Sequence, residues 1–347
     1  MFILSKMSIA LNELLRATSR SFWLTLRVLP GAIRPQIGLA YLLARTTDTI
    51  ADTEIIPLEQ RLEALHKLRG RILGSNTTPL NFGELAKQQG LPAEKLLLEK
   101  VEDSLAALQQ FSAENQKWIR EVLVTITSGQ ELDLRRFANA SAEQIVALQT
   151  AAELDDYTYR VAGCVGEFWT KMCRAHLFPK KRLDVEEFIN DGIRFGKGLQ
   201  LVNILRDLPA DLKKGRCYLP LEKLEPVGLW PEILFSPATE SKFLSLYRKY
   251  LDDAQARLES GWHYTNTLPF WQVRVRLACA WPILIGAKTI AKLRAADLNA
   301  LRTRVKVSRG EVYWILLSSS LTYPLPFVWR KLFPKHGKAV ASEANLA

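Results

Sequence analysis

The stretch that decides the fold reads GKGLQLVNILRDLPADLKKGRCYLP and covers residues 196–220. Its polar side chains recur at steps of three, four and four as Gln200, Asn203, Asp207 and Asp211, and leucine, isoleucine and valine fill most positions between them. This spacing places the four polar side chains on one face of an α-helix. A stripe of oxygen-bearing side chains suits a metal site better than an ordinary surface, so the stretch predicts a helix that carries chemistry.

The helical spacing extends along nearly the whole chain. Apolar residues recur at three and four positions in ten segments, and glycine and proline fall mainly between the segments. No convincing strand alternation and no internal repeat is present, so we predict an all-α fold. The segments expected to be helical are 8–29, 35–53, 58–73, 94–111, 114–137, 143–178, 184–212, 240–262, 271–293 and 307–321.

The composition is that of a globular protein with anionic partners. The chain has 347 residues, of which 48% are hydrophobic and 24% charged, and its net charge is +11. Such a charge favours phosphorylated substrates, an acidic membrane surface or nucleic acid. The basic residues do not alternate with stacking aromatic residues, so nucleic-acid binding is not expected.

Cysteine spacing and the N-terminal sequence indicate a cytoplasmic protein. The four cysteines are widely separated and form no CxxC pair, which favours a reducing compartment over a disulfide framework or a zinc site. The first twenty residues contain no apolar run long enough for a signal peptide. Secretion is therefore not expected.

A second pair of carboxylates, Asp48 and Asp52, has the same four-residue spacing. Like charges at that spacing repel by about 0.2–0.5 kcal/mol, and a divalent cation such as Mg²⁺ would offset the repulsion while binding substrate phosphate. Neighbouring Arg45, Arg206 and Arg216 are candidates to hold phosphate oxygens. The alternatives are a solvated acidic face and ordinary surface salt bridges.

The C-terminal end combines apolar and basic sequence. Residues 312–329 contain no charge, but Pro324 and Pro326 interrupt them, and the helix before these prolines spans only about 16 Å. A bilayer core is roughly 30 Å thick, so the segment is too short to cross it. Basic residues follow, which favours peripheral attachment to an anionic leaflet; the alternative is a helix that packs on the body. The basic residues are Arg330, Lys331, Lys335 and Lys338.

Four blocks of sequence, in order, resemble the squalene/phytoene synthase family of head-to-head prenyl transferases. The resemblance covers Ser19 to about Arg294 and predicts a prenyl transferase domain over residues 1–305, with residues 306–347 as a C-terminal tail. The blocks are SRSFWLTLRVLP (19–30), YLLARTTDTIAD (41–52), YTYRVAGCVG (157–166) and LQLVNILRDLPADLKKGRCYLP (199–220).

The resemblance implies an isoprenoid-synthase-like helical bundle around a central cavity, with named residues in it. Phe22 and the backbone of 161–163 would line a prenyl channel, and either Tyr157 or Tyr159 would relay a proton. The residues implied to bind Mg²⁺ are Asp48, Asp52, Asn203, Asp207 and Asp211, and those implied to contact diphosphate are Ser21, Arg45, Gln200 and Arg216.

The activity implied is the condensation of two farnesyl diphosphates through presqualene diphosphate to squalene, with NADPH as reductant. Thr49 stands where the phytoene synthase pattern has an aspartate, which resembles the squalene synthase version of the block. Thr53 and Thr158 depart from the family pattern. We expect the enzyme to lie at the inner face of a membrane, beside downstream isoprenoid enzymes. The alternatives are a non-reductive phytoene, dehydrosqualene or presqualene diphosphate synthase, and a non-catalytic scaffold protein.

Overall fold

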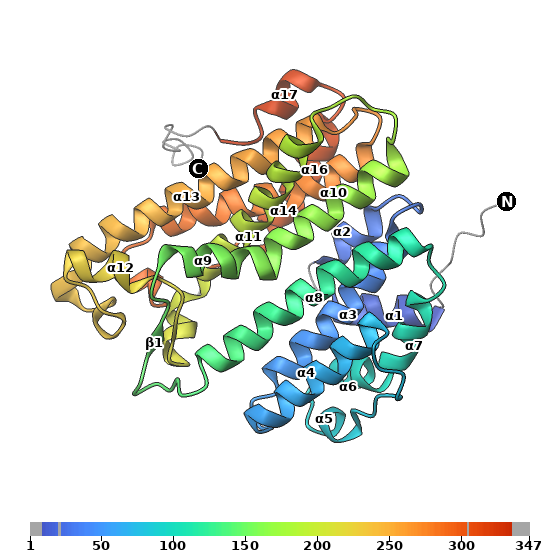
Figure 1. Cartoon of the computed structure of the whole chain (residues 1–347). Helices are drawn as coiled ribbons and strands as arrows, with labels where there is room; N and C mark the ends of the chain where they lie inside the picture. Colours follow the sequence, from blue (N-terminus) through green and yellow to red (C-terminus); the bar gives the residue numbers. More distant parts are fainter. Residues whose placement is uncertain (1–8, 20–21, 304, 335–347) are drawn as a thin grey trace.

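The computed structural model describes residues 9–19, 22–303 and 305–334, and nearly all regular structure in this part of the chain is helical (Figure 1). The prediction of an all-α fold is confirmed. The strands found in these residues are β1 (Val146–Ala147) and β2 (Arg216–Cys217), which pair in parallel with Val146 opposite Arg216. This short bridge ties together two loops that are far apart in the sequence.

In the first half of the chain, helices α3, α4 and α8 pack against one another. Ser112 begins α8 by accepting a hydrogen bond from the amide of Asn115 at 3.3 Å, and Gly74 ends α4 with a φ of 78°. The helices of this half are α1 (Ile9–Thr18), α2 (Trp23–Val28), α3 (Arg34–Asp52), α4 (Leu58–Leu73), α5 (Gly83–Lys87), α6 (Pro92–Glu99), α7 (Val101–Leu108) and α8 (Ala113–Arg136).

The second half is arranged around α11 (Val185–Lys213), which packs against α10, α13, α14 and a π-helical turn. Asp184 caps the start of α11 by accepting from the amide of Glu187 at 3.0 Å. The other helices are α9 (Ala151–Thr158), the π-helical turn (Tyr159–Gly163), α10 (Cys164–Leu177), α12 (Leu221–Leu224), α13 (Glu240–Thr267), α14 (Val273–Ala295), α15 (Leu298–Leu301), α16 (Arg309–Thr322) and α17 (Pro326–Arg330), with 3₁₀ turns at Glu225–Val227, Pro231–Ile233 and Pro237–Thr239.

Buried apolar side chains form two clusters, and α11 contributes to both. Phe188, near its start, belongs to the cluster of the first half, and Leu205, further along, belongs to the cluster of the second half. All four cysteines are buried thiols without a disulfide. Because α11 is shared, it joins the two halves and holds its polar stripe in a fixed position between them.

A pair of glycines brings α10 and α11 into backbone contact. A methyl group on Gly166 would overlap the carbonyl of Gly192, and one on Gly192 would meet the backbone of Gly166. Only glycine fits at such a crossing, because any side chain would force the two helix axes apart. This close approach sets the position of the π-helical turn, which directly precedes α10.

The chain beyond α14 folds back onto the body of the molecule. Trp329 of α17 is 1% exposed and stacks on Trp262 of α13, with ring centroids 5.2 Å apart. Its indole nitrogen donates to Oδ1 of Asn266 at 2.9 Å. In the described ranges no helix is both long enough and apolar enough to cross a membrane.

Three predicted helices are wrong in their extent. Residues 143–178 were expected to be continuous, but 146–147 pair with β2 and a new helix begins where Thr150 accepts a hydrogen bond from the amide of Glu153. The predicted helix 8–29 is likewise interrupted between α1 and α2, and the predicted helix 94–111 is divided at Lys100 into α6 and α7. In the first case pairing with a distant segment and a capping side chain overrode the local periodicity.

We expect Gly166→Ala to lower the free energy of unfolding by about 1–3 kcal/mol or more, because the added methyl overpacks the crossing of α10 and α11. Chemical denaturation would measure the change. Gly31→Ala is the matched control, since a methyl group there meets nothing within 4 Å. Equal stability of both variants would show that the glycine contact does not hold the helices together.

Candidate active site

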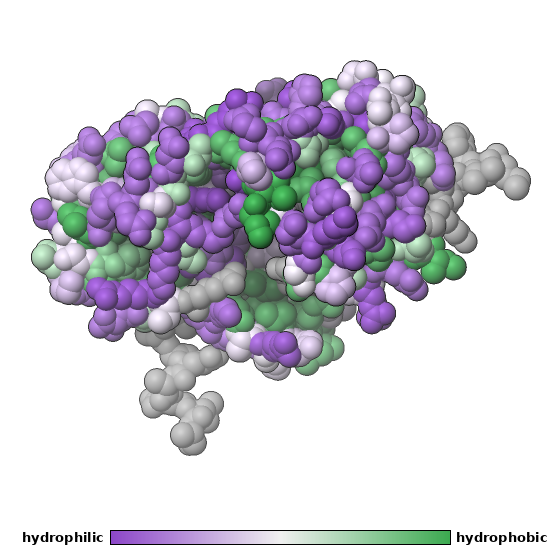
Figure 2. All heavy atoms as spheres, turned by 90° about the horizontal axis from the view of Figure 1, so that it is seen from below, coloured by the Kyte–Doolittle hydropathy of each residue, from purple (hydrophilic) through white to green (hydrophobic). Residues whose placement is uncertain are grey.

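A cavity of about 330 Å³ lies where the C-terminal ends of α3 and α8 face α9, α11 and β2. Seen from below, the molecule is hollowed near its centre, and the surrounding surface is largely hydrophilic (Figure 2). We call this space the polar cavity. Its charged and hydrogen-bonding lining comes from Asp48, Asp52, Arg61, Gln130, Asp133, Tyr157, Gln200, Arg216 and Tyr218.

Asp48 and Asp52 reach the polar cavity from the last turns of α3. Asp48 accepts a hydrogen bond from Nε2 of Gln130 and lies 3.8 Å from Nη1 of Arg45. Its enclosure by protein, followed by the charge of Asp52, raises the pKa of Asp48 to about 6. Desolvation likewise raises the pKa of Asp52. Asp48 and Asp52, the first predicted pair, therefore lie where two ionised carboxylates without a bound cation are unfavourable.

The second pair comes from the last turns of α11. Burial, followed by the nearby charge of Asp207, raises the pKa of Asp211 to about 7. Arg216 and Lys214 oppose this rise, while Asp133 adds to it. Because Asp133 also interacts with Asp52, the carboxylates of α3, α8 and α11 form one electrostatic group. The structure thus brings the two predicted pairs to the same region.

Asp207 itself is held by its neighbour in the chain. Nε and Nη2 of Arg206 donate to the two carboxylate oxygens of Asp207 at 3.0 and 2.5 Å. Neither residue lines the polar cavity, although Arg206 lines the neighbouring one. Arg206 therefore partly neutralises Asp207 instead of pointing into the polar cavity as a phosphate ligand.

Two of the predicted phosphate ligands contact acidic side chains in this structure. Nη2 of Arg216 lies 3.4 Å from Oε1 of Glu54, which also pairs with Lys214 at 3.1 Å. Arg216 remains in the lining of the polar cavity, and its guanidinium lies 5.9 Å from the ring centroid of Phe137. Arg45 instead donates to Glu94 of α6 at 2.5 Å and lies outside the lining.

Asp133 and Gln130 of α8 belong to the site, although the sequence analysis missed both. Burial, the largest influence, raises the pKa of Asp133 to about 6, and its Oδ2 accepts a hydrogen bond from the hydroxyl of Tyr218 at 2.7 Å. Three-residue spacing on a largely apolar helix face was the signal that could have identified the two residues. Arg61 of α4, also missed, lines the same cavity.

The two candidate tyrosines lie in different places. Tyr157 lines the polar cavity, is 9% exposed and stacks on Tyr218 with centroids 4.6 Å apart. Burial raises the pKa of Tyr157 far above its ordinary value. The hydroxyl of Tyr159 instead donates to Glu167 at 3.0 Å outside that cavity. The structure therefore does not bring Tyr159 to the site.

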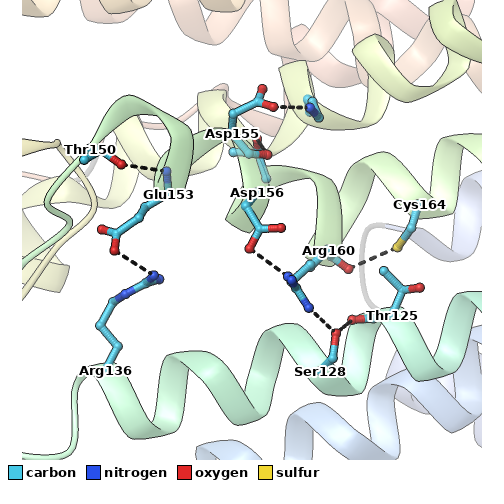
Figure 3. Close-up of polar contacts among 11 residues, drawn as sticks. Thr125, Ser128, Arg136, Thr150, Glu153, Asp155, Asp156, Arg160 and Cys164 are labelled. Atoms are coloured by element: carbon cyan, nitrogen blue, oxygen red, sulfur yellow. Dashed lines mark hydrogen bonds and ion pairs between the residues drawn. The ribbon is translucent and has the colours of Figure 1, made fainter.

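Polar contacts with α8 hold the segment that presents Tyr157 (Figure 3). Arg160 donates to Ser128 of α8 at 2.8 Å and to Asp156 at 2.7 Å. Near the end of α8, Arg136 lies 3.6 Å from the carboxylate of Glu153. These contacts fix α9 and the π-helical turn against α8, so the direction of the Tyr157 ring is set by both helices.

An apolar cavity of about 560 Å³ lies alongside, between α2, α11, α14 and α16. Phe22 and Asn203, both predicted site residues, line it, together with Leu199 of α11. Gln200, the next residue, faces the polar cavity. The adjacent residues Leu199 and Gln200 of α11 thus line the apolar cavity and the polar cavity, respectively. Ser21, the remaining predicted phosphate contact, lies outside the described residues.

The chemistry of the side chains fits Mg²⁺, but they do not form a closed cage. In the described part of the chain no three histidine, cysteine or carboxylate side chains converge closely enough to hold an ion. Oδ1 of Asp133 and Oε1 of Gln130 are buried oxygens without a hydrogen-bond partner. Mg²⁺ commonly takes only one or two carboxylates and completes its shell with water and phosphate. The residues present suit that mode of binding.

Comparison with known proteins shows the same family over most of the chain. The sequence pattern of the squalene/phytoene synthase family matches residues 15–311. The chain is 31% identical to the presqualene diphosphate synthase of Rhodopseudomonas palustris, over 88% of this chain and 94% of that one. It is 26% identical to the squalene synthase of Saccharomyces cerevisiae, over 88% of this chain and 66% of that one.

The bifunctional lycopene cyclase/phytoene synthase of Phaeosphaeria nodorum is 30% identical over 74% of this chain, and the chain spans only 41% of that protein's length. Among solved structures, TcSQS in complex with the ligand E5700 superposes with a TM-score of 0.73 at 22% identity, covering 92% of this chain and 90% of that one. This last likeness establishes the fold.

We expect Asp211→Asn to raise the melting temperature at about pH 8 in metal-free buffer, with a gain that shrinks toward about pH 4. The raised pKa means that the folded state binds a proton, between pH 3.8 and about 7, which the unfolded chain has released. Stability attributable to Asp211 therefore falls as the pH rises through that window.

The control for Asp211→Asn is Asp103→Asn on α7, where the side chain is 56% exposed. Thermal melts of both variants and of the wild type across the window would measure the effect. A pH-independent difference between Asp211→Asn and wild type would contradict the electrostatic account.

Proposed function

The chain belongs to the squalene/phytoene synthase family, whose members are prenyl transferases, and we propose that it condenses two farnesyl diphosphates through presqualene diphosphate to squalene with NADPH. One observation carries the proposal. Carboxylates of α3 and α8 and the guanidinium of Arg216 line a polar cavity, the charge of Asp211 on α11 interacts with Asp133 in that lining, and α11 also lines an apolar cavity. A diphosphate and a long apolar chain each have a matching compartment.

Binding of the diphosphate begins with the cations at the polar cavity. Arg216 and Lys214 contact Glu54, an exposed side chain, so a diphosphate can replace this carboxylate at little cost. A guanidinium binds two phosphate oxygens at once and stabilises the charge that develops as the carbon–oxygen bond breaks. Gln200 supplies an amide group from the same wall.

The residues that would hold Mg²⁺ are four aspartates whose carboxylates repel one another, together with the amide oxygen of Asn203. When bound, Mg²⁺ would neutralise the leaving diphosphate. The ionised carboxylates hold such a cation and lose their mutual repulsion in doing so. The proposed ligands are Asp48, Asp52, Asn203, Asp207 and Asp211.

Tyr157 is the group of this chain placed to handle the proton lost when the cyclopropane of presqualene diphosphate forms. Its raised pKa keeps the phenol protonated, so its oxygen would accept the proton that leaves carbon while its own hydroxyl proton passes to the diphosphate. Stacking on Tyr218, which is bonded to Asp133, orients the ring.

The apolar cavity excludes water from the reacting cations. Phe22, Leu199 and Ile285 contribute apolar walls, and Phe22 stacks on Tyr41 with centroids 5.2 Å apart. A cation reached by water would give an alcohol, so this lining protects the intermediate. Lys306 stands in the same lining and offers positive charge of the kind that dinucleotide phosphates require.

Two observations support the proposed reduction to squalene with NADPH: Thr49 and the likeness to the yeast squalene synthase. The likeness to the presqualene diphosphate synthase of Rhodopseudomonas palustris favours a second candidate, a non-reductive enzyme that stops at presqualene diphosphate, dehydrosqualene or phytoene. A non-catalytic scaffold protein would have no need for buried carboxylates around a cavity, so the polar cavity argues against that role.

We also propose that the protein works at the inner, cytoplasmic face of a membrane, where downstream isoprenoid enzymes would take up its product. Aromatic and aliphatic side chains of α16 and α17 are exposed beside Arg330 and Lys331. Apolar surface next to basic charge is typical of proteins that bind an anionic leaflet without crossing it.

We expect purified protein incubated with farnesyl diphosphate and Mg²⁺ to convert it to squalene only when NADPH is present. Without NADPH, presqualene diphosphate should accumulate or give dehydrosqualene and alcohols, because the rearranged cation then lacks a hydride donor. Mass spectrometry of the extracted products would distinguish these results.

Identical products with and without NADPH would replace the reductive proposal with the non-reductive one. Complete absence of condensation, in protein whose helical circular dichroism is intact, would favour the scaffold role.

We expect Tyr157→Phe to reduce turnover by roughly 10²-fold or more, as loss of a proton-transfer group does, and Tyr159→Phe to stay near wild type. The two substitutions remove the same hydroxyl from residues two positions apart, so each controls for the other. Steady-state rates with farnesyl diphosphate would measure the effect. Equal loss in both variants would contradict the separate roles proposed for them.

A further inference from the structure

Helix α16 is apolar on two opposite sides. Val312 and Leu316 on its inner side line the apolar cavity. Tyr313, Leu317 and Leu321 form a stripe on its outer side and are 66%, 52% and 68% exposed. A helix that is apolar all round is normally covered on all sides. In the described part of the chain the outer side of α16 has no such cover.

The exposed surface extends beyond α16. Trp314 on the same helix, Phe327 on α17 and Trp271 in the loop before α14 are each about two-thirds exposed or more. Monomeric soluble proteins rarely expose so many large apolar side chains together. We call the residues Trp271, Tyr313, Trp314, Leu317, Leu321 and Phe327 the outer apolar face.

The charge beside the outer apolar face indicates what covers it. Lys331 lies with its ammonium 4.1 Å from the ring centroid of Phe327, and Arg330 precedes it. Arg309 stands at the other end, in the first turn of α16. Tryptophan and tyrosine beside lysine and arginine are the residues that settle at the interface of a bilayer. An anionic lipid surface therefore matches both the apolar side chains and the positive charge of this region.

The ends of α16 are fixed, but its middle is held mainly by apolar packing. At its start Ser308 caps the helix, and Glu311 pairs with Lys292 at 2.6 Å. Beyond its end, α17 is anchored through Trp329 on Asn266. Along the middle, one polar contact joins it to α14, from Trp281 to Ser319 at 3.1 Å. The central turns can therefore shift without breaking the anchors.

We propose that the outer apolar face docks on an anionic bilayer and that the hydrocarbon product leaves the apolar cavity past α16 directly into the lipid. This inference rests on the proposed function, since it needs a long isoprenoid hydrocarbon in the apolar cavity. Such a product is insoluble in water, so its release is favourable only where α16 separates the cavity from lipid. α16 is the one element of the cavity lining whose opposite side bears the outer apolar face.

The experiment compares wild type with the double variant Leu317→Ser, Leu321→Ser. A double variant with Leu73→Ser and Leu91→Ser is the matched control, because these leucines are 46% and 49% exposed and lie among α4 to α6, away from α16 (Figure 1). Vesicles of phosphatidylcholine and phosphatidylglycerol serve as the lipid probe. For each protein, co-sedimentation measures vesicle binding, and rapid-quench kinetics measure the first turnover and the steady-state rate.

We expect loss of the two outer leucines to weaken vesicle binding by roughly tenfold or more, since apolar burial is lost. The first turnover should be unchanged in all three proteins, because neither substitution reaches the cavity. Vesicles should raise the steady-state rate of wild type and of the control, and should fail to raise that of the outer-face variant.

Equal vesicle binding by the outer-face variant and wild type would overturn the docking surface. Weakened binding with the same vesicle stimulation as wild type would overturn the release route past α16. Absence of a first turnover in every protein would refute the proposed function instead, and the binding measurement would still decide whether the outer apolar face meets lipid.

Discussion

Mutual repulsion among partly desolvated carboxylates is the constraint on which the site depends. Asp48, Asp133 and Asp211 come from three different helices, and enclosure by protein raises the pKa of each. Nearby cations such as Arg45, Arg216 and Lys214 offset only part of the cost of gathering these carboxylates. The energy that holds them together must come from elsewhere, namely from the two apolar clusters that pack the helices.

Helix α11 connects the apolar clusters to the site, because the clusters hold it in place and it carries site residues. It contributes to both apolar clusters, and the contact of Gly166 with Gly192 holds its backbone directly against that of α10. Its polar stripe can therefore carry Gln200 toward the charged space and Asn203 toward the apolar one. A diphosphate head and a prenyl chain, bound on either side, would be aligned by one rigid element.

A lipid bilayer would cover the exposed apolar side of α16. One side of this helix lines the apolar cavity, and the other presents an apolar surface. That outer surface is exposed to solvent when the molecule is surrounded by water. With its outer side in lipid, both sides would face apolar surroundings. In that arrangement the basic residues Arg330 and Lys331 would lie at the level of the anionic head groups.

The features of this protein that the sequence determined by itself are those that depend on the helical period. Residues three or four apart share a helix face whatever the rest of the chain does, so the pairs Asp48–Asp52 and Asp207–Asp211 and the all-α class were readable directly. The blocks around these pairs supported the family. The predicted extents agree closely with α4, α8 and α11, whereas the predicted helices 8–29, 94–111 and 143–178 are each divided in the structure.

What only the tertiary structure decided concerns contacts between helices. The spacing of Gln130 and Asp133 puts them on one helix face, but the pattern of one helix does not encode the angle at which the next crosses it, so only the structure brought that face to the site. The same reason hid the pairing of Arg45 with Glu94. Tyr157 and Tyr159 lie two positions apart, and their separation depends on the π-helical turn and on its contacts with α8. Packing against α14 decided which side of α16 stayed exposed.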